Sequence, residues 1–217
     1  MGGLHMRMGM SLGMRVEQSV EQKLEQRIEK RLRLRQRAFA LRMELVQALR
    51  GERYVPKGDC PRCNKKMTPV EIIQGFNRDP NDFTTRCSNR RCRHRFAPIL
   101  VWHANAVRAE APFYCAAQTL AQLPRKETLS PERFAREQQA VYRSAIVHYG
   151  GIGQAFRKIG IAYAFKEVAD PKRKIKPFLG KLPDTVIAEC ADVSVYAIRK
   201  MRKQLRIARY TAPKNLN

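Results

Sequence analysis

The chain of 217 residues contains two close pairs of cysteines, Cys60-Pro-Arg-Cys63 and Cys87-Ser-Asn-Arg-Arg-Cys92. A CxxC turn directs two sulfur atoms at one point, and a second such turn completes a set of four ligands. The spacing therefore predicts one structural Zn²⁺ bound by Cys60, Cys63, Cys87 and Cys92, with no coordination position left open for catalysis. Because the second pair is CxxxxC, His94 in place of Cys92 is an alternative fourth ligand.

A redox-active CxxC is the main alternative to a metal site. A redox motif of the thioredoxin type opens a helix after a strand, whereas Asn64-Lys65-Lys66 follows this one as a polar turn. The sequence thus favours structural zinc. The other two cysteines, Cys115 and Cys190, lie in apolar helical patterns and are expected to be small core residues.

Residues 54–102 resemble the zinc ribbon class through these cysteine pairs and through Arg95-Phe-Ala-Pro-Ile-Leu-Val101, which is expected to form the closing strand. An insert departs from a plain ribbon, because Thr68-Pro-Val-Glu71 provides an N-cap, a proline at the first helical position and a glutamate at the third. A short helix is predicted from Pro69 to Gln74. We expect a zinc ribbon with a helical insert over residues 51–103.

Residues 14–50 are predicted to be helical, as one long helix or two, because the stretch from Met14 to Leu49 contains neither proline nor glycine. Its apolar residues recur every four positions, so the apolar stripe drifts by about 40° per step, which is not the pattern of a heptad zipper. Residues 1–13 are expected to be a disordered leader. The four arginines at 31, 33, 35 and 37 form either a solvated face or a stretch that contacts phosphates.

The segment 104–169 is predicted to be a helical domain. Pro112 is expected to open a helix that runs to Leu123, and Ser130-Pro131 is expected to cap a helix that runs to about Tyr149. A further helix at 152–159, the turn residue Gly160 and a short helix at 161–168 complete a pattern that resembles trihelical helix-turn-helix proteins over residues 130–169. Phe156 and Lys166 depart from that pattern, so this unit is an architectural element in the alternative interpretation.

Residues 183–210 resemble a second helix-turn-helix, with the match carried by residues 183–207. Its expected buried positions are Ile187, Ala188, Ala191, Val193, Ile198 and Met201. Ser194 is predicted to cap the second helix, and Asp192 stands where glycine is usual but tolerates a left-handed turn. The resemblance implies that DNA is contacted by Ser194, Val195, Tyr196, Arg199, Lys200, Arg202 and Lys203. A solvated basic helix is the alternative interpretation.

The two helical units are joined by residues 170–182, which are basic and flanked by prolines. We expect an extended segment, either a plain linker or an arm that lies along a DNA groove. The arm interpretation assigns DNA contacts to Lys172, Arg173, Lys174 and Lys176. Residues 211–217 are expected to be a tail.

The net charge of the chain indicates which kind of partner it binds. Lysine and arginine number 43 against 19 acidic residues, for a net charge of +24 and a pI near 10.5. Such an excess favours binding to nucleic acid or to an anionic membrane surface, and its spread over several modules favours nucleic acid. No uninterrupted apolar run is long enough for a membrane span.

Taken together, the patterns predict a mainly α protein with a small β zinc ribbon, arranged as a long N-terminal helix, the ribbon and tandem helix-turn-helix domains. The expected function is that of a non-enzymatic, zinc-containing regulator of transcription that reads duplex DNA and is cytoplasmic and nucleoid-associated. The alternative is a zinc ribbon protein that binds RNA, a ribonucleoprotein or RNA polymerase. A nucleic-acid enzyme subunit is a third class, but Asp79 and Asp82 form the only close Asp pair.

Overall fold

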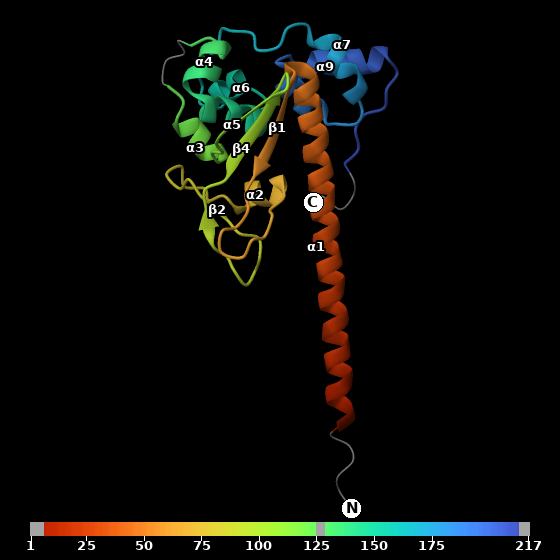
Figure 1. Ribbon diagram of the computed structural model, residues 1–217. Coiled ribbons are helices and arrows are strands. Elements are labelled where there is room, and N and C mark those ends of the chain that lie inside the picture. The colour runs from red at the N-terminus through yellow and green to blue at the C-terminus, as the bar shows by residue number, and fades with distance from the viewer. Residues whose placement is uncertain (1–6, 125–128, 213–217) are drawn as a thin grey trace, which may run out of the picture.

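The computed structural model describes the backbone of residues 7–124 and 129–212 and the side chains of residues 20–124 and 129–212. About half of the chain is helical, and the strands form small antiparallel sheets. The longest element is α1, Arg7–Arg50, whose N-terminal part projects away from the rest of the molecule (Figure 1). A long N-terminal helix was expected and is confirmed.

Helix α1 begins earlier than predicted. The backbone is helical from Arg7, so the expected disordered leader is wrong for residues 7–13, and residues 1–6 lie outside the described part of the chain. Gly9 and Gly13 each cost about 1 kcal/mol in a helix, but extending a helix that is already nucleated is far easier than starting one. Among the described side chains of α1, residues 20–50, the buried ones lie in the C-terminal turns, namely Met43, Leu45, Val46 and Leu49.

A three-stranded antiparallel sheet follows α1, with the order β1-β4-β5. Strand β1 spans Glu52–Lys57, β4 spans Ile99–Ala104 and β5 spans Val107–Pro112. In the register of β1 and β4, Tyr54 is opposite Trp102. The β4–β5 hairpin turns through Asn105 and Ala106, both at positive φ, as a two-residue turn between twisted strands requires.

Two expectations about this sheet are wrong. Pro112 ends β5 and does not open a helix, because the antiparallel pairing with β4 uses the residues before it and an edge strand tolerates proline. The single strand expected over residues 95–101 is split into β3, Arg95–Phe96, and β4, with β3 paired instead to β2, Thr85–Arg86. The insert helix is confirmed as α2, Pro69–Gly75, with a complete capping box between Thr68 and Glu71.

The helices after the sheet are shorter than predicted. Helix α3, Ala116–Ala121, begins only after Cys115, whose sulfur accepts a hydrogen bond from the amide of Gln118. The helix expected over residues 131–149 is divided at Gln138, where φ is −131°, into α4, Pro131–Glu137, and α5, Gln139–Tyr149. Gly150 ends α5 in a left-handed conformation, and α6, Ile152–Lys158, follows directly.

The first predicted helix-turn-helix unit is wrong in its second helix. Residues 161–168 contain no helix. The carboxylate of Glu167 accepts hydrogen bonds from the amides of Ile152 and Gly153 at the start of α6, and the ring of Tyr163 stacks on Phe156 with 5.1 Å between centroids. These tertiary contacts hold the segment across α6 and outweigh its local helical pattern.

The basic segment after residue 170 is also not extended. It forms α7, Pro171–Ile175, and a 3-10 turn, η1, Lys176–Phe178. Pro171 suits the first position of a helix, α7 packs on α1, and Ile175 is buried in the core. The chain ends in α8, Asp184–Ala191, and α9, Val195–Gln204, and one continuous apolar core joins these helices to α1, α5, α6 and the sheet.

Candidate metal centre and basic helix face

Four cysteines come together at one point. One Sγ atom from each of Cys60, Cys63, Cys87 and Cys92 lies within 4.8 Å of every other one, and these residues are here called the cysteine cluster. The Sγ atoms of Cys60 and Cys92 are 3.7 Å apart, and those of Cys63 and Cys87 are 3.6 Å apart. These separations exclude a disulfide, whose sulfurs lie about 2.05 Å apart, and leave room for a metal ion between them.

Each cysteine pair sits on a tight turn that is closed by backbone hydrogen bonds. In the first turn the amide of Asn64 donates to the carbonyl of Cys60 at 2.8 Å, and Asn64 has a φ of +57°. In the second turn the amide of Arg93 donates to the carbonyl of Asn89 at 3.0 Å, and Arg93 has a φ of +48°. Asparagine tolerates this left-handed conformation better than most residues, so the first turn is the less strained of the two.

His94 does not belong to the cysteine cluster, so the alternative in which it replaces Cys92 is wrong. Its backbone carbonyl instead accepts a hydrogen bond from the amide of Cys87 at 2.8 Å. A hydrogen bond from the Lys65 backbone lowers the pKa of Cys63 to about 7, while burial raises the pKa of Cys87 to about 12. Four thiols must lose protons to bind a metal ion, so the affinity of this site for a metal falls with falling pH.

The cysteine cluster is braced by the insert helix. The carboxylate of Glu71 on α2 accepts a hydrogen bond from Ser88 at 2.8 Å and pairs with Lys65 at 3.2 Å, so it joins the two cysteine turns. Arg95 Nη2 forms an ion pair with Asp82 Oδ2 at 2.6 Å. The exposed cations around the cluster are Arg62, Lys66, Arg86, Arg90, Arg91 and Arg93.

A second candidate site is formed by α8 and α9. Asp192 joins them in a left-handed conformation with a φ of +53°, and Ser194 caps α9 by accepting a hydrogen bond from the amide of Ala197 at 3.2 Å. Arg157 of α6 holds the turn through an ion pair of 2.7 Å with Asp192. The predicted buried positions Ile187, Ala188, Ala191, Val193, Ile198 and Met201 are all buried in the core or packed against it.

Helix α9 presents a basic face, which we define as Tyr196, Arg199, Lys200 and Lys203. All four are exposed, and Tyr196 has 74% of its surface accessible. Arg202 and Val195, which were also expected to contact DNA, do not lie on this face. Arg202 is turned inward, with its Nε atom 3.1 Å from Asp184 Oδ1 and its side chain 11% exposed. Val195 is half-buried against the core.

Helix α9 ends at Gln204, and Leu205, which follows it, is 40% exposed. The charged residues at 172–176 lie on α7 and at the start of η1 rather than on an extended arm. Lys172, Arg173 and Lys176 are exposed, and Lys174 Nζ donates to the carbonyl of Leu49 at 3.1 Å, which ties α7 to the end of α1.

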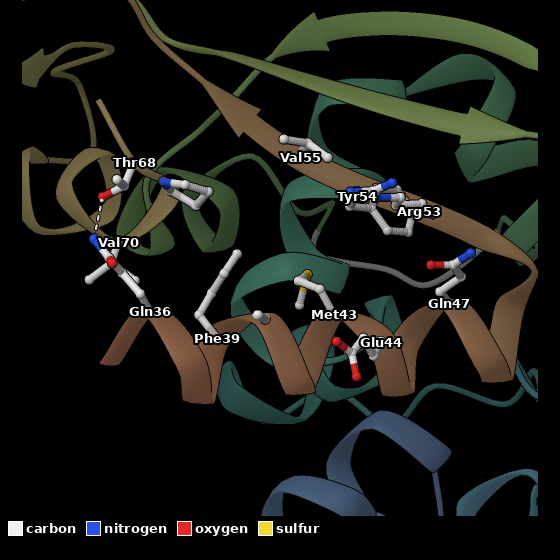
Figure 2. A pocket seen from close by; sticks show the side chains of 12 residues that line it. Gln36, Phe39, Met43, Glu44, Gln47, Arg53, Tyr54, Val55, Thr68 and Val70 are labelled. Atoms are coloured by element: carbon white, nitrogen blue, oxygen red, sulfur yellow. Dashed lines mark hydrogen bonds between the residues drawn. The ribbon is translucent and has the colours of Figure 1, made fainter. Parts of the chain in front are cut away.

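A groove of about 440 Å³ lies between α1, β1 and the start of α2 (Figure 2). Phe39 and Met43 of α1 and Val55 of β1 give it an apolar lining, and at one end Gln36 Nε2 donates to Thr68 Oγ1 at 3.1 Å. Its lining contains neither cysteine nor histidine. The groove marks the seam along which α1 packs beside β1 and α2.

Comparisons of the chain with models of known protein families, with curated proteins and with solved structures found no match. Within the described residues, no helix is both long enough and apolar enough to cross a membrane.

Proposed function

We propose that this protein is a zinc-containing regulator of transcription that binds duplex DNA through a helix-turn-helix formed by α8 and α9, without an enzymatic activity of its own. The observation that carries the proposal is the basic face of α9. Two short helices joined by a left-handed residue are the arrangement in which such proteins place the second helix in the major groove. Arginine can pair with guanine through two hydrogen bonds, and lysine can hold a phosphate.

The metal of the cysteine cluster is Zn²⁺ in this proposal. A regular tetrahedron with Zn–S bonds of about 2.3 Å places its sulfurs about 3.8 Å apart, close to the separations of 3.6 and 3.7 Å found here. Four thiolates leave no ligand position open, so the zinc stabilises the turns and takes no part in a reaction. It supplies folding energy to a segment with few strands of its own.

The charge distribution supports a polyanionic partner. Residues 151–217 hold fifteen lysines and arginines against five acidic residues. Lys172 and Arg173 of α7 and Lys176 of η1 extend the positive surface beyond the basic face, and as exposed cations they suit contacts with phosphates rather than with bases.

One observation favours RNA as the second candidate partner. Six exposed cations surround the cysteine cluster, outside the α8–α9 unit. A protein that used this surface would bind structured RNA or a ribonucleoprotein by charge and shape, with no need for α9.

The proposal is tested by selecting bound sequences from a random duplex pool with the full chain, followed by competition with structured RNA at fixed salt. We expect an enriched DNA motif that R199A/K203A loses, because these residues lie one turn apart on the basic face. The matched control R108A/R136A removes the same charge from β5 and α4 and keeps the motif. An enriched motif that survives R199A/K203A contradicts the assignment, and preferential displacement by RNA supports the second candidate.

A further inference from the structure

The projecting part of α1 carries an exposed apolar stripe, which we define as Val20, Leu24 and Ile28. These residues are 59%, 55% and 44% exposed, and every residue from 20 to 31 is exposed. A single helix in water is only marginally stable, and most helices gain their stability by packing an apolar face. Within the described residues, nothing in the chain covers this face.

The spacing of the stripe determines the kind of contact that it can make. Residues four apart advance by about 40° around a straight helix, so the three side chains span about 80°, within the width of one apolar face. Such a row is a ridge of the i±4 type. When two helices interdigitate ridges of this type they cross at about −50°, which gives a short contact centred on Leu24 rather than a zipper.

Acidic side chains lie on one side of the stripe and basic side chains on the other. At about 100° per residue, Glu21 and Glu25 lie on one flank of the stripe, and Lys23 and Arg27 lie on the other. If two copies face each other in parallel about a twofold axis, the acidic flank of each helix meets the basic flank of the other. In an antiparallel pair the acidic flank would face the acidic flank of the other helix, and the basic flank would face the basic one. The pattern is therefore self-complementary for a parallel pair alone.

The same charges argue against nucleic acid as the occupant. A duplex that lay along the stripe would bring its phosphates close to Glu21 and Glu25. Because both groups are negatively charged, this contact is unfavourable. A second copy satisfies both flanks and covers the aliphatic side chains.

We propose that this protein forms a parallel homodimer through the stripe Val20, Leu24 and Ile28 of α1, with Glu21 and Glu25 of each copy beside Lys23 and Arg27 of the other. The contact is independent of nucleic acid. It places both folded bodies at the same end of the helix pair.

The test is the mass of the full chain by sedimentation equilibrium, after nuclease treatment and at high salt. We expect a dimer that V20A/L24A/I28A converts to a monomer. Alanine has the highest helix propensity, so this variant keeps α1 helical, as circular dichroism checks. The control V107A/I159A removes exposed apolar groups elsewhere and leaves the dimer intact. A monomeric full chain, or a dimer that survives the triple alanine variant, overturns the proposal.

Charge reversal tests the charge pairing across the contact, and cross-linking tests the orientation of the helices. E21K/E25K makes both flanks basic, and K23E/R27E makes both acidic, so each variant alone should lose dimer and the mixture should regain it. In oxidising buffer V20C should cross-link to itself, because parallel copies bring the two Val20 positions together. Cross-linking of V20C to I28C in mixtures, with none of V20C to itself, would mean that the helices are antiparallel and would overturn the parallel arrangement.

Discussion

Single cysteines determine whether the cluster holds its metal. We expect Cys63→Ser to reduce the zinc content from about one to near zero per chain, because three thiolates and a hydroxyl hold the ion far more weakly. Hydrogen exchange should accelerate over residues 58–98, while α5, α6 and α8 keep their protection because they pack in the common core. Metal analysis and exchange measure both effects.

Cys115 provides the control for this prediction. It is buried and does not belong to the cluster, and its sulfur caps α3, a role that a serine hydroxyl can also fill. The Cys115→Ser variant should therefore keep its zinc. Retention of a full zinc equivalent by Cys63→Ser would contradict the four-thiolate site.

His148 makes the stability of the fold depend on pH. Its ring stacks on Phe113 at 5.1 Å, and its Nε2–H donates to the carbonyl of Tyr114 at 2.7 Å. Burial lowers the pKa of His148 from 6.5 to about 4, and Arg42 acts in the same direction. Between pH 6.5 and about 4, His148 is therefore protonated in the unfolded chain and neutral in the folded chain. The stability that neutral His148 contributes is fully present above pH 6.5 and is lost as the pH falls toward 4.

We expect the free energy of unfolding to fall by about 1–3 kcal/mol from this residue alone as the pH is lowered across that window. His148→Gln keeps an N–H donor for Tyr114 but does not titrate, so its pH dependence should be shallower. Urea unfolding of both proteins at matched pH values measures the difference, and the cysteine cluster, common to both, cancels. Parallel curves for the two proteins would show that His148 titrates normally.

At the scale of the element, α9 has two faces with different tasks. Arg202 pairs with Asp184 of α8 and donates through Nη1 to the carbonyl of Ile207 at 3.1 Å. Its removal leaves a buried carboxylate without its partner. We therefore expect Arg202→Ala to lower the free energy of unfolding by about 3 kcal/mol.

Arg199 is the matched control, because it lies on the same helix but is exposed. Arg199→Ala should change the free energy of unfolding by no more than about 0.5 kcal/mol. Chemical denaturation of both variants separates the structural arginine from the one proposed to contact DNA. Equal stability of the two variants would mean that the pair of Arg202 with Asp184 contributes nothing.

Local signals were reliable where an element is specified by its own residues. The capping box at Thr68, the caps at Ser130 and Ser194 and the left-handed Asp192 were all predicted, because each depends on contacts within three or four residues. The cysteine cluster was predicted for a similar reason, since each pair forms a local turn. Strand β5 was not predicted, because its residues carry no strong strand signal of their own and form a strand by pairing with β4.

At the scale of the whole molecule, a buried ion pair joins the first helix to the middle of the chain. Arg50 Nη1 lies 3.0 Å from Glu167 Oε2, and the two side chains are only 6% and 1% exposed. Glu167 also accepts the amide hydrogens at the start of α6. One carboxylate therefore connects α1, α6 and the segment 161–168.

We expect Glu167→Gln to lower the free energy of unfolding by about 3–5 kcal/mol, because it keeps the shape of the side chain but leaves Arg50 as a buried charge without its partner. Thermal and urea unfolding measure the loss. Glu29→Gln is the comparison, since the pair of Glu29 with Arg33 is exposed and surface pairs contribute about 0–1 kcal/mol. Similar values for the two variants would contradict the role given to Glu167.

The sequence by itself determined the long helix α1, the caps, the cysteine cluster and the buried positions of α8 and α9. These features depend on helix propensity, on the ligand spacing within each cysteine pair and on apolar periodicity, which act between near neighbours. Only the tertiary structure decided that residues 161–168 leave the helical state, that α7 is folded onto α1 and that Arg202 points inward. Each of these outcomes depends on a partner distant in the sequence, Ile152 for Glu167, Leu49 for Lys174 and Asp184 for Arg202, and burial beside such a partner outweighs local preference.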